Sequence, residues 1–114
     1  MKKRTSPNDL RIWWIWIRTS FRNSQFWGIT VDDQIRQLIP LRDNEGVLVA
    51  AFAGPPPYLG DQLREADVIH AINGRRVSSV ETLRTEIDNV KRTQPIVLQV
   101  ERNGSLTFLV MEGN

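Results

Sequence analysis

The chain offers few side chains that could carry out catalysis. His70 is the only histidine, and there is no cysteine. A nucleophile–base pair would have to use His70, yet nothing in the sequence places Ser or Asp around it as a catalytic triad needs, so we expect a structural role for it. Asp32 and Asp33 form a candidate carboxylate pair, but adjacent strand residues point to opposite faces, and two solvated acids in a turn are expected. No His, Cys or Glu cluster has the spacing of metal ligands. The sequence therefore predicts no catalytic residue, no metal and no cofactor, and the protein is not expected to be an enzyme.

A second kind of chemistry belongs to the backbone. Phe26-Trp27-Gly28-Ile29 places a glycine among bulky apolar residues near the start of an expected strand at 26–31. A glycine inside a strand indicates the close approach of another backbone or an unusual dihedral angle. Successive backbone N–H groups can converge on an anion, and glycine permits the approach. The alternative interpretation is a glycine at a bulge or a barrel corner.

Two turn signals and a helix cap outline the elements that hold this motif. Asn73-Gly74 and Asn103-Gly104 are typical of tight turns between strands. Ser78-Ser79-Val80-Glu81 is a capping box, with Ser78 as N-cap and Glu81 at the third helical position. We expect strands at 26–31, 46–52, 67–73, 96–101 and 106–111, a helical turn at 33–39, a short helix at 58–63 and a longer helix at 79–91. This order predicts a small α+β fold, a five- to six-stranded half-open β-barrel with two helices.

Length and charge divide the chain into a basic arm and one domain. The 114 residues suffice for a single domain with its own core. Residues 1–23 contain six Lys or Arg and one Asp, a balance of +5, whereas residues 24–114 contain nine basic and twelve acidic residues, a balance of −3. A nucleic-acid-binding body would itself be basic, so no nucleic-acid partner is expected. We interpret residues 1–23 as a Trp-rich arm and residues 24–114 as the domain.

The arm contains the longest apolar run of the chain, Ile12 to Ile17. This run is far shorter than the roughly 20 residues that span a bilayer, and no signal-peptide cleavage site follows it. Ser6-Pro7-Asn8-Asp9 is typical of a helix start, but Ile and Trp favour strands, so residues 6–22 have a helical and a strand interpretation. Three roles are open for the arm: packing on the domain's own surface, an interface for self-association or a neighbouring domain, and contact with a membrane surface.

The order of these motifs resembles the PDZ domains attached to bacterial high-temperature-requirement (HtrA/Deg-like) serine proteases. The resemblance covers about residues 25–112. It rests on Gly46-Val47-Leu48-Val49, Gly54-Pro55-Pro56, Asp67 to Gly74, Val77 to Leu83 and Val97 to Gly104. The family usually has Gly-Asp where this chain has Ala66-Asp67. The resemblance implies a non-catalytic peptide-binding module, as the regulatory or substrate-recognition part of a protease, and it favours a periplasmic or cell-envelope location.

The resemblance also implies where a peptide's end is held. In such domains a loop of pattern aromatic-apolar-Gly-apolar binds the terminal carboxylate through backbone N–H groups, and the peptide adds as a strand to the residues that follow. In this chain the peptide would lie beside residues 28–31. The residues that the resemblance assigns to this role are Phe26, Trp27, Gly28, Ile29 and Thr30.

The helix at 79–91 is the other wall of the implied groove. Val80 and Ile87 are assigned to its inward face and Arg84 to its edge, although Val80 and Ile87 are core residues in the alternative interpretation. A Gly28→Val or Val80→Glu change is expected to abolish binding and to leave folding largely intact.

The expected partners are protein C-termini or unfolded, extended polypeptide segments. The alternative function is an assembly module, in which the Trp-rich arm drives self-association and the groove is closed or occupied by the arm itself.

Overall fold

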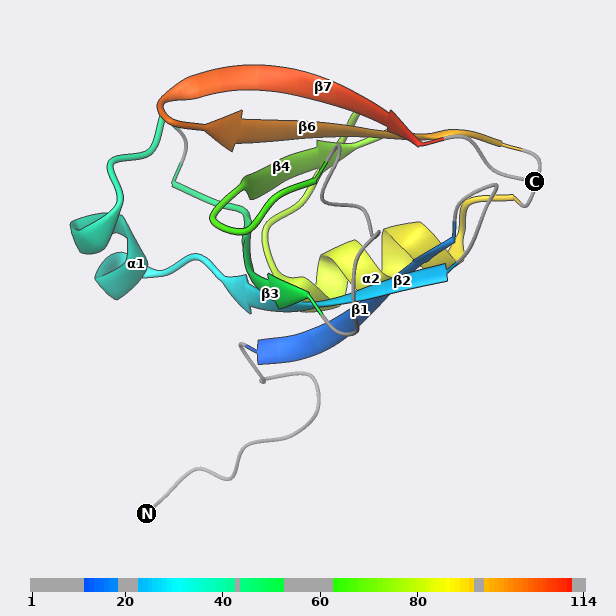
Figure 1. Cartoon of the computed structure of the whole chain (residues 1–114), viewed down its shortest axis with the longest axis horizontal. Helices are drawn as coiled ribbons and strands as arrows, with labels where there is room; N and C mark the ends of the chain where they lie inside the picture. The colour runs from blue at the N-terminus through cyan, green and yellow to red at the C-terminus, as the bar shows by residue number, and fades with distance from the viewer. Residues whose placement is uncertain (1–11, 19–22, 43, 53–62, 92–93, 112–114) are drawn as a thin grey trace, which may run out of the picture.

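The computed structural model of the chain describes residues 12–18, 23–42, 44–52, 63–91 and 94–111. Within these residues, seven strands form one unclosed antiparallel sheet accompanied by two helices (Figure 1). The strands are β1 (Ile12–Arg18), β2 (Asn23–Thr30), β3 (Val47–Phe52), β4 (Val68–Ile72), β5 (Arg75–Arg76), β6 (Ile96–Arg102) and β7 (Ser105–Met111). The helices are α1 (Asp33–Leu38) and α2 (Val80–Asp88). The predicted small α+β fold is confirmed. β5 was not expected, whereas β1 agrees with the strand interpretation of the arm.

The strand order in the sheet is β1-β2-β3-β4-β6-β7, with β5 paired to β4 alone. The helix α2 lies beside β1 and β2, whereas α1 lies at the end of the molecule where the chain passes from β2 to β3 (Figure 1). Among the described residues, no helix has the length and apolar character needed to cross a membrane.

The described part of the N-terminal arm is a strand. β1 pairs antiparallel with β2, from Ile12 opposite Ile29 to Arg18 opposite Asn23. The helical interpretation of the arm is therefore wrong for residues 12–18. The short helix expected at 58–63 lies outside the described residues except for Leu63, which is fully buried.

One hydrophobic core lies between the sheet and α2. Alternate residues of β3 and β6 supply part of it, as expected for a sheet with one buried face, whereas β4 supplies residues on both sides of a register shift. Its buried members are Ile15, Phe26, Val47, Val49, Leu63, Ile69, Ile72, Val77, Val80, Leu83, Ile96, Leu98 and Val100. The largest of the fully buried side chains is Phe26. Since burial of one such side chain is worth about 1.5–3 kcal/mol, β2 is tied firmly to the domain.

Both predicted Asn-Gly turns are present. Asn73 and Gly74 have φ angles of 50° and 83°, and Asn103 and Gly104 have φ angles of 53° and 81°. Positive φ at both central residues characterises the type I′ turn, whose twist matches that of the strands it joins. These turns connect β4 to β5 and β6 to β7.

The N-terminal cap of α2 differs from the prediction by one residue. Ser79 is the N-cap, and its side chain accepts a hydrogen bond from the Thr82 backbone N–H at 3.1 Å. Ser78 therefore does not cap the helix, and Glu81 lies at the second helical position. The helix ends at Asp88, with Asn89 as its C-cap. Two adjacent serines are both good caps, and local sequence alone does not decide between them.

His70 and Glu101 form a buried polar pair on β4 and β6. Their exposed fractions are 4% and 3%. Nε2 of His70 lies 2.9 Å from Oε1 of Glu101, and Nδ1 lies 2.7 Å from the carbonyl oxygen of Glu45. The Glu101 carboxylate also accepts hydrogen bonds from the Arg42 backbone N–H at 3.0 and 3.1 Å. Because buried polar groups need such partners, this network links the two strands to the chain before β3.

Asp67 and Arg102 join the chain just before β4 to the end of β6. Asp67 is 1% exposed and accepts hydrogen bonds from Nε and Nη2 of Arg102 at 2.8 and 2.6 Å. The hydrogen bond to Asp67 raises the pKa of Arg102 above its ordinary value, and the charge of Asp67 adds to this effect while burial opposes it. A two-point contact of this kind fixes geometry as well as charge.

Ala66 precedes this pair in a strained conformation. Its φ angle is +78°, in the left-handed region that costs a residue with a Cβ atom roughly 1–2 kcal/mol. We expect Ala66→Gly to raise the free energy of unfolding by about 0.5–1 kcal/mol, because the released strain exceeds the backbone entropy that glycine loses on folding. Urea unfolding measures the change. Ala71→Gly within β4 is the matched control and should lower the same free energy; if both variants are destabilised, Ala66 is not strained.

Candidate functional site

β1 covers the edge of β2 that faces α2. The two strands run antiparallel, with Trp13 opposite Gly28 and Ile15 opposite Phe26. On its other side β2 pairs with β3, so β2 has a paired strand along both edges. The backbone from Phe26 to Ile29 therefore lies between strands and does not form an open loop. We call the space between β2 and α2, which β1 fills, the strand slot.

Two side chains of β1 hold it in the strand slot. Ile15 is 1% exposed and belongs to the core, and Trp13 is partly buried against that core. On α2, the guanidinium carbon of Arg84 lies 4.2 Å from the centroid of the Trp13 ring. A cation over an indole face is stabilising by about 0.5–1 kcal/mol at an exposed site. Backbone pairing, burial and this cation–π contact together hold β1 between β2 and α2.

Thr30 fixes the position of β2 relative to α2 at the end of the slot where α2 begins. Its Oγ1 accepts a hydrogen bond of 3.0 Å from the backbone N–H of Val80. Val80 is the first residue of α2, and N–H groups in the first turn have no acceptor within their own helix. The end of β2 therefore supplies that acceptor, and the slot has a defined width where α2 begins.

Gly28 lies at a β-bulge and faces the core. The register of β2 against β3 shifts between Trp27 and Gly28. A Cβ atom at Gly28 would lie 2.8 Å from Cγ1 of Val47 and 3.4 Å from Cγ1 of Ile15. This close packing requires glycine, so Gly28→Val would disturb the core. The expectation that this change would leave folding largely intact does not agree with this packing.

Phe26 and Val80 are likewise core residues, with exposed fractions of 0% and 1%. Their side chains contribute to the floor beneath β1. Val80→Glu would place a carboxylate in an apolar environment, which costs several kcal/mol unless the group is paired or protonated. It would therefore affect folding as well as binding. Ile87 is partly buried and packs against the same core, as the alternative interpretation of the sequence expected.

Trp27 and Ile29 lie on the opposite face of β2, away from the core. Trp27 packs against Trp14 of β1, with ring centroids 3.8 Å apart and planes inclined by 35°. Ile29 lies opposite Ile12 in the antiparallel register. Thus β2 contributes to the strand slot through its backbone and the side chains of Phe26 and Thr30, whereas Trp27 and Ile29 form part of a separate surface.

Trp13 and Ile15 belong to the site, although the sequence did not single them out. The signal that identifies them is the two-residue alternation of a strand, which places them on one face and Ile12 and Trp14 on the other. Since all four residues are apolar, the sequence does not distinguish the two faces of this strand.

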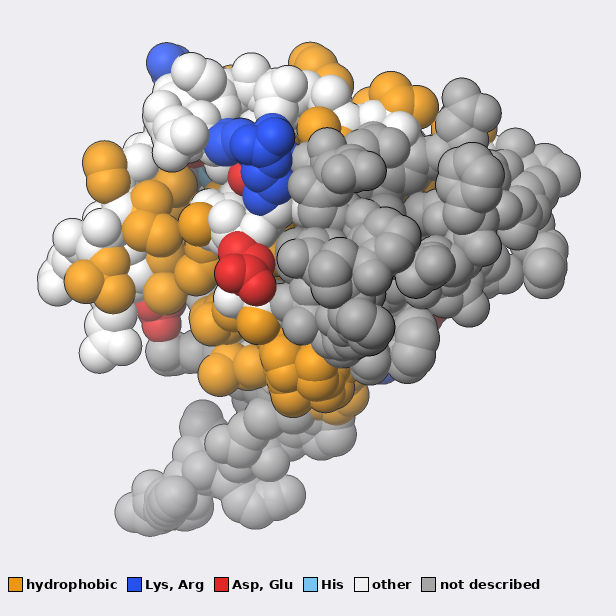
Figure 2. Space-filling model, viewed as in Figure 1, with side chains coloured by type: hydrophobic (Ala, Val, Ile, Leu, Met, Phe, Trp, Pro, Cys, Tyr) orange, Lys and Arg blue, Asp and Glu red, His pale blue; other side chains and the backbone are white. Residues whose placement is uncertain are grey.

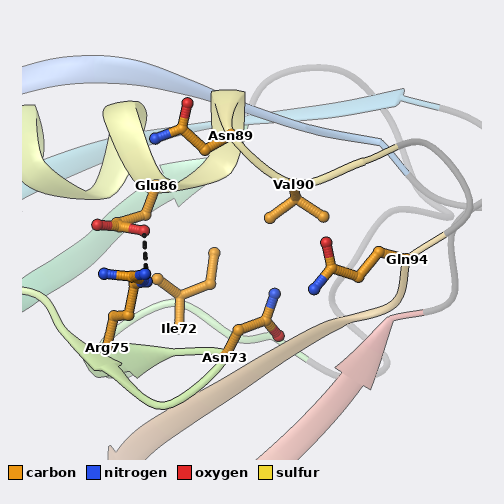
Figure 3. Close-up of a pocket in the computed structure, with 7 residues that line it drawn as sticks. All are labelled: Ile72, Asn73, Arg75, Glu86, Asn89, Val90 and Gln94. Carbon is orange, nitrogen blue, oxygen red and sulfur yellow. Dashed lines mark ion pairs between the residues drawn. The ribbon is translucent and has the colours of Figure 1, made fainter.

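A separate pocket of about 320 Å³ opens beside the C-terminal part of α2 (Figure 3). It is lined by Ile72, Asn73, Arg75, Glu86, Asn89, Val90 and Gln94. Arg75 and Glu86 form an ion pair at one side of it, with Nε 3.6 Å from Oε1. None of the described residues that line it comes from β1 or β2, so we treat this pocket separately from the strand slot. Within the described ranges, no group of three or more His, Asp or Glu residues has a geometry that could hold a metal ion.

The chain belongs to the PDZ domain family, because residues 25–109 match that family. No curated protein matches the chain closely enough to name a relative. PDZ domains are non-catalytic modules that mediate protein–protein or peptide binding. The match begins inside β2, so β1 lies before the matched region.

Proposed function

We propose that the chain binds extended polypeptide segments by strand addition in the slot between β2 and α2. The observation that supports this proposal is β1 itself. Seven residues of extended chain pair with β2 there, and one side of that strand is buried against the core. Peptide recognition by strand addition uses backbone hydrogen bonds for affinity and alternate side chains for specificity.

The proposed ligand has apolar side chains at alternate positions. The positions of Trp13 and Ile15 set this pattern, since one packs beneath Arg84 and the other enters the core. A ligand would run in the direction of β1, antiparallel to β2. Both internal segments and free C-termini are included, but a terminal carboxylate reaches the backbone of Phe26 to Ile29 only when β1 has left that edge. An internal segment can pair with part of β2 while the rest of β1 stays docked. Partial docking of β1 therefore favours internal segments as ligands.

The protease context implied by the sequence resemblance is part of the proposal. A module that captures unfolded, apolar segments would deliver them to a protease or regulate one. The chemistry of the slot suits this role because backbone pairing accepts many sequences.

Assembly is a second candidate function that the same observation favours. If the slot accepts β1 of its own chain, it can accept β1 of another copy, and exchange of an identical element is a common route to dimers. Sedimentation of the intact chain distinguishes the two: a concentration-dependent dimer supports exchange, and a monomer that binds peptide supports recognition.

NMR titration of the intact chain with apolar, extended peptides is the test of the proposed site. We expect the amide signals of β2 near Gly28 and of α2 near Arg84 to shift, while those of β7 stay unchanged. Arg84→Ala removes the cation–π partner of Trp13 and so weakens the docking of β1, and a peptide with an aliphatic residue at the position of Trp13 should therefore bind severalfold more tightly. Peptides with a free and with an amidated C-terminus show whether the carboxylate takes part. Shifts confined to β5 or β7 would contradict the proposed site.

A further inference from the structure

The outer face of β1, β2 and β3 is apolar where a solvated sheet face is normally polar. Its described members are Ile12 and Trp14 on β1, Trp27 and Ile29 on β2, and Leu48 on β3; we call them the tryptophan face. Ile12 is 52% exposed, and the others are partly exposed. Antiparallel sheets with one buried face usually alternate apolar and polar residues, and these strands do not.

Register places these side chains side by side. Ile12 lies opposite Ile29, Trp14 lies opposite Trp27, and Ile29 lies opposite Leu48. The space-filling view shows apolar side chains gathered at the lower part of the molecule, where Figure 1 places β1 and β2 (Figure 2). A continuous apolar surface of this kind marks a contact with a partner or a membrane.

The positive charge of the sequence around β1 favours an anionic partner for this face. The arm of residues 1–23, with six Lys or Arg and one Asp, joins the sheet at Ile12, the most exposed member of the face. Arg11 directly precedes β1 and Arg18 ends it. The remaining residues 24–114 have a balance of −3, so the positive charge of the sequence is concentrated in the segment that contains β1.

We propose that the tryptophan face docks on the surface of an anionic lipid bilayer. Trp is enriched at the boundary between lipid and water, where aliphatic neighbours enter the acyl region. Each Lys or Arg near an anionic membrane adds to the electrostatic attraction. A second copy is a poorer occupant, because its residues 1–23 have the same balance of +5 and like charges oppose association.

Intrinsic fluorescence makes this proposal testable on the intact chain, because all four tryptophans lie in β1 and β2. The chain is mixed with vesicles of phosphatidylcholine alone or with added phosphatidylglycerol, and sedimentation and the emission maximum are recorded. Binding and a blue shift are expected only with phosphatidylglycerol, and they should weaken as salt is raised.

Three variants separate the two contributions to membrane binding. Trp14→Ser should lower vesicle partitioning at least tenfold, and so should the combined change Lys2→Glu, Lys3→Glu and Arg4→Glu, which alters no described residue of the sheet. Phe108→Ser is the matched control: Phe108 is 66% exposed on β7, outside the tryptophan face, and its loss should leave partitioning unchanged. The proposal is overturned if the intact chain does not bind the anionic vesicles, if all three variants bind alike, or if it binds an oligonucleotide in preference to vesicles.

Discussion

Replacement of Ile15 by Asp is expected to raise the affinity of the strand slot for extended peptides by at least tenfold. Ile15 is 1% exposed in the core, and an unpaired carboxylate there costs several kcal/mol in addition to the lost apolar burial. The docked state of β1 therefore becomes unfavourable. A peptide can bind only to molecules whose slot is empty, so its apparent dissociation constant falls in proportion as the empty fraction rises. Each 1.4 kcal/mol lost from the docking of β1 raises that fraction tenfold and therefore gives tenfold tighter peptide binding.

Ile12→Asp is the matched control on the same strand. It makes the same chemical change at a position that is 52% exposed on the outer face, so peptide affinity should change less than twofold. Circular dichroism checks whether the Ile15→Asp chain remains folded. Trp13→Ser, which removes a partly buried side chain, provides a milder release of β1. Equal affinities of the Ile15→Asp and Ile12→Asp chains would show that β1 does not control access to the slot.

Replacement of Phe26 by Ala is expected to lower the free energy of unfolding by about 3–5 kcal/mol, the range found for buried aromatic side chains. Phe26 has no exposed surface and is the largest of the fully buried side chains. Urea unfolding with an unchanged slope measures the loss. The result would identify Phe26 as a core residue that supports the slot from below.

Phe108→Ala is the control for this measurement. Phe108 is 66% exposed on β7, so its removal should change the free energy of unfolding by less than about 0.5 kcal/mol. Similar losses in the two variants would contradict the assignment of Phe26 to the core.

Those parts of the fold that depend on short-range chemistry were predictable from the sequence. The turn at Asn103-Gly104 needs positive φ at two successive residues, and Asn and Gly are the residue types that adopt it most readily. The approximate extent of α2 followed from its cap and periodicity, although Ser78 and Ser79 are chemically equivalent caps and the sequence prediction chose the wrong one.

The conformation and place of β1 were not predictable in this way. Both faces of the strand are apolar, because one packs in the core and the other forms the tryptophan face, so neither a period of two nor a helical period stands out. The role of Gly28 was ambiguous for a related reason. Its need for glycine arises from Val47 on a neighbouring strand, a contact between residues distant in sequence. The family resemblance implied a groove between residues 28–31 and the helix at 79–91, but β1 lies before the region that matches the family.

The most direct test of the strand slot is a titration with the chain's own strand. A fluorescein-labelled peptide of residues 10–18 is added to the unchanged chain and to the Ile15→Asp chain, and its anisotropy is followed. We predict that the Ile15→Asp chain binds this peptide at least tenfold more tightly than the unchanged chain does, and that the same peptide with Asp in place of Ile15 binds neither. Equal binding by the two chains, or no binding by the folded Ile15→Asp chain, would contradict the proposal that the space between β2 and α2 is a site for extended polypeptide.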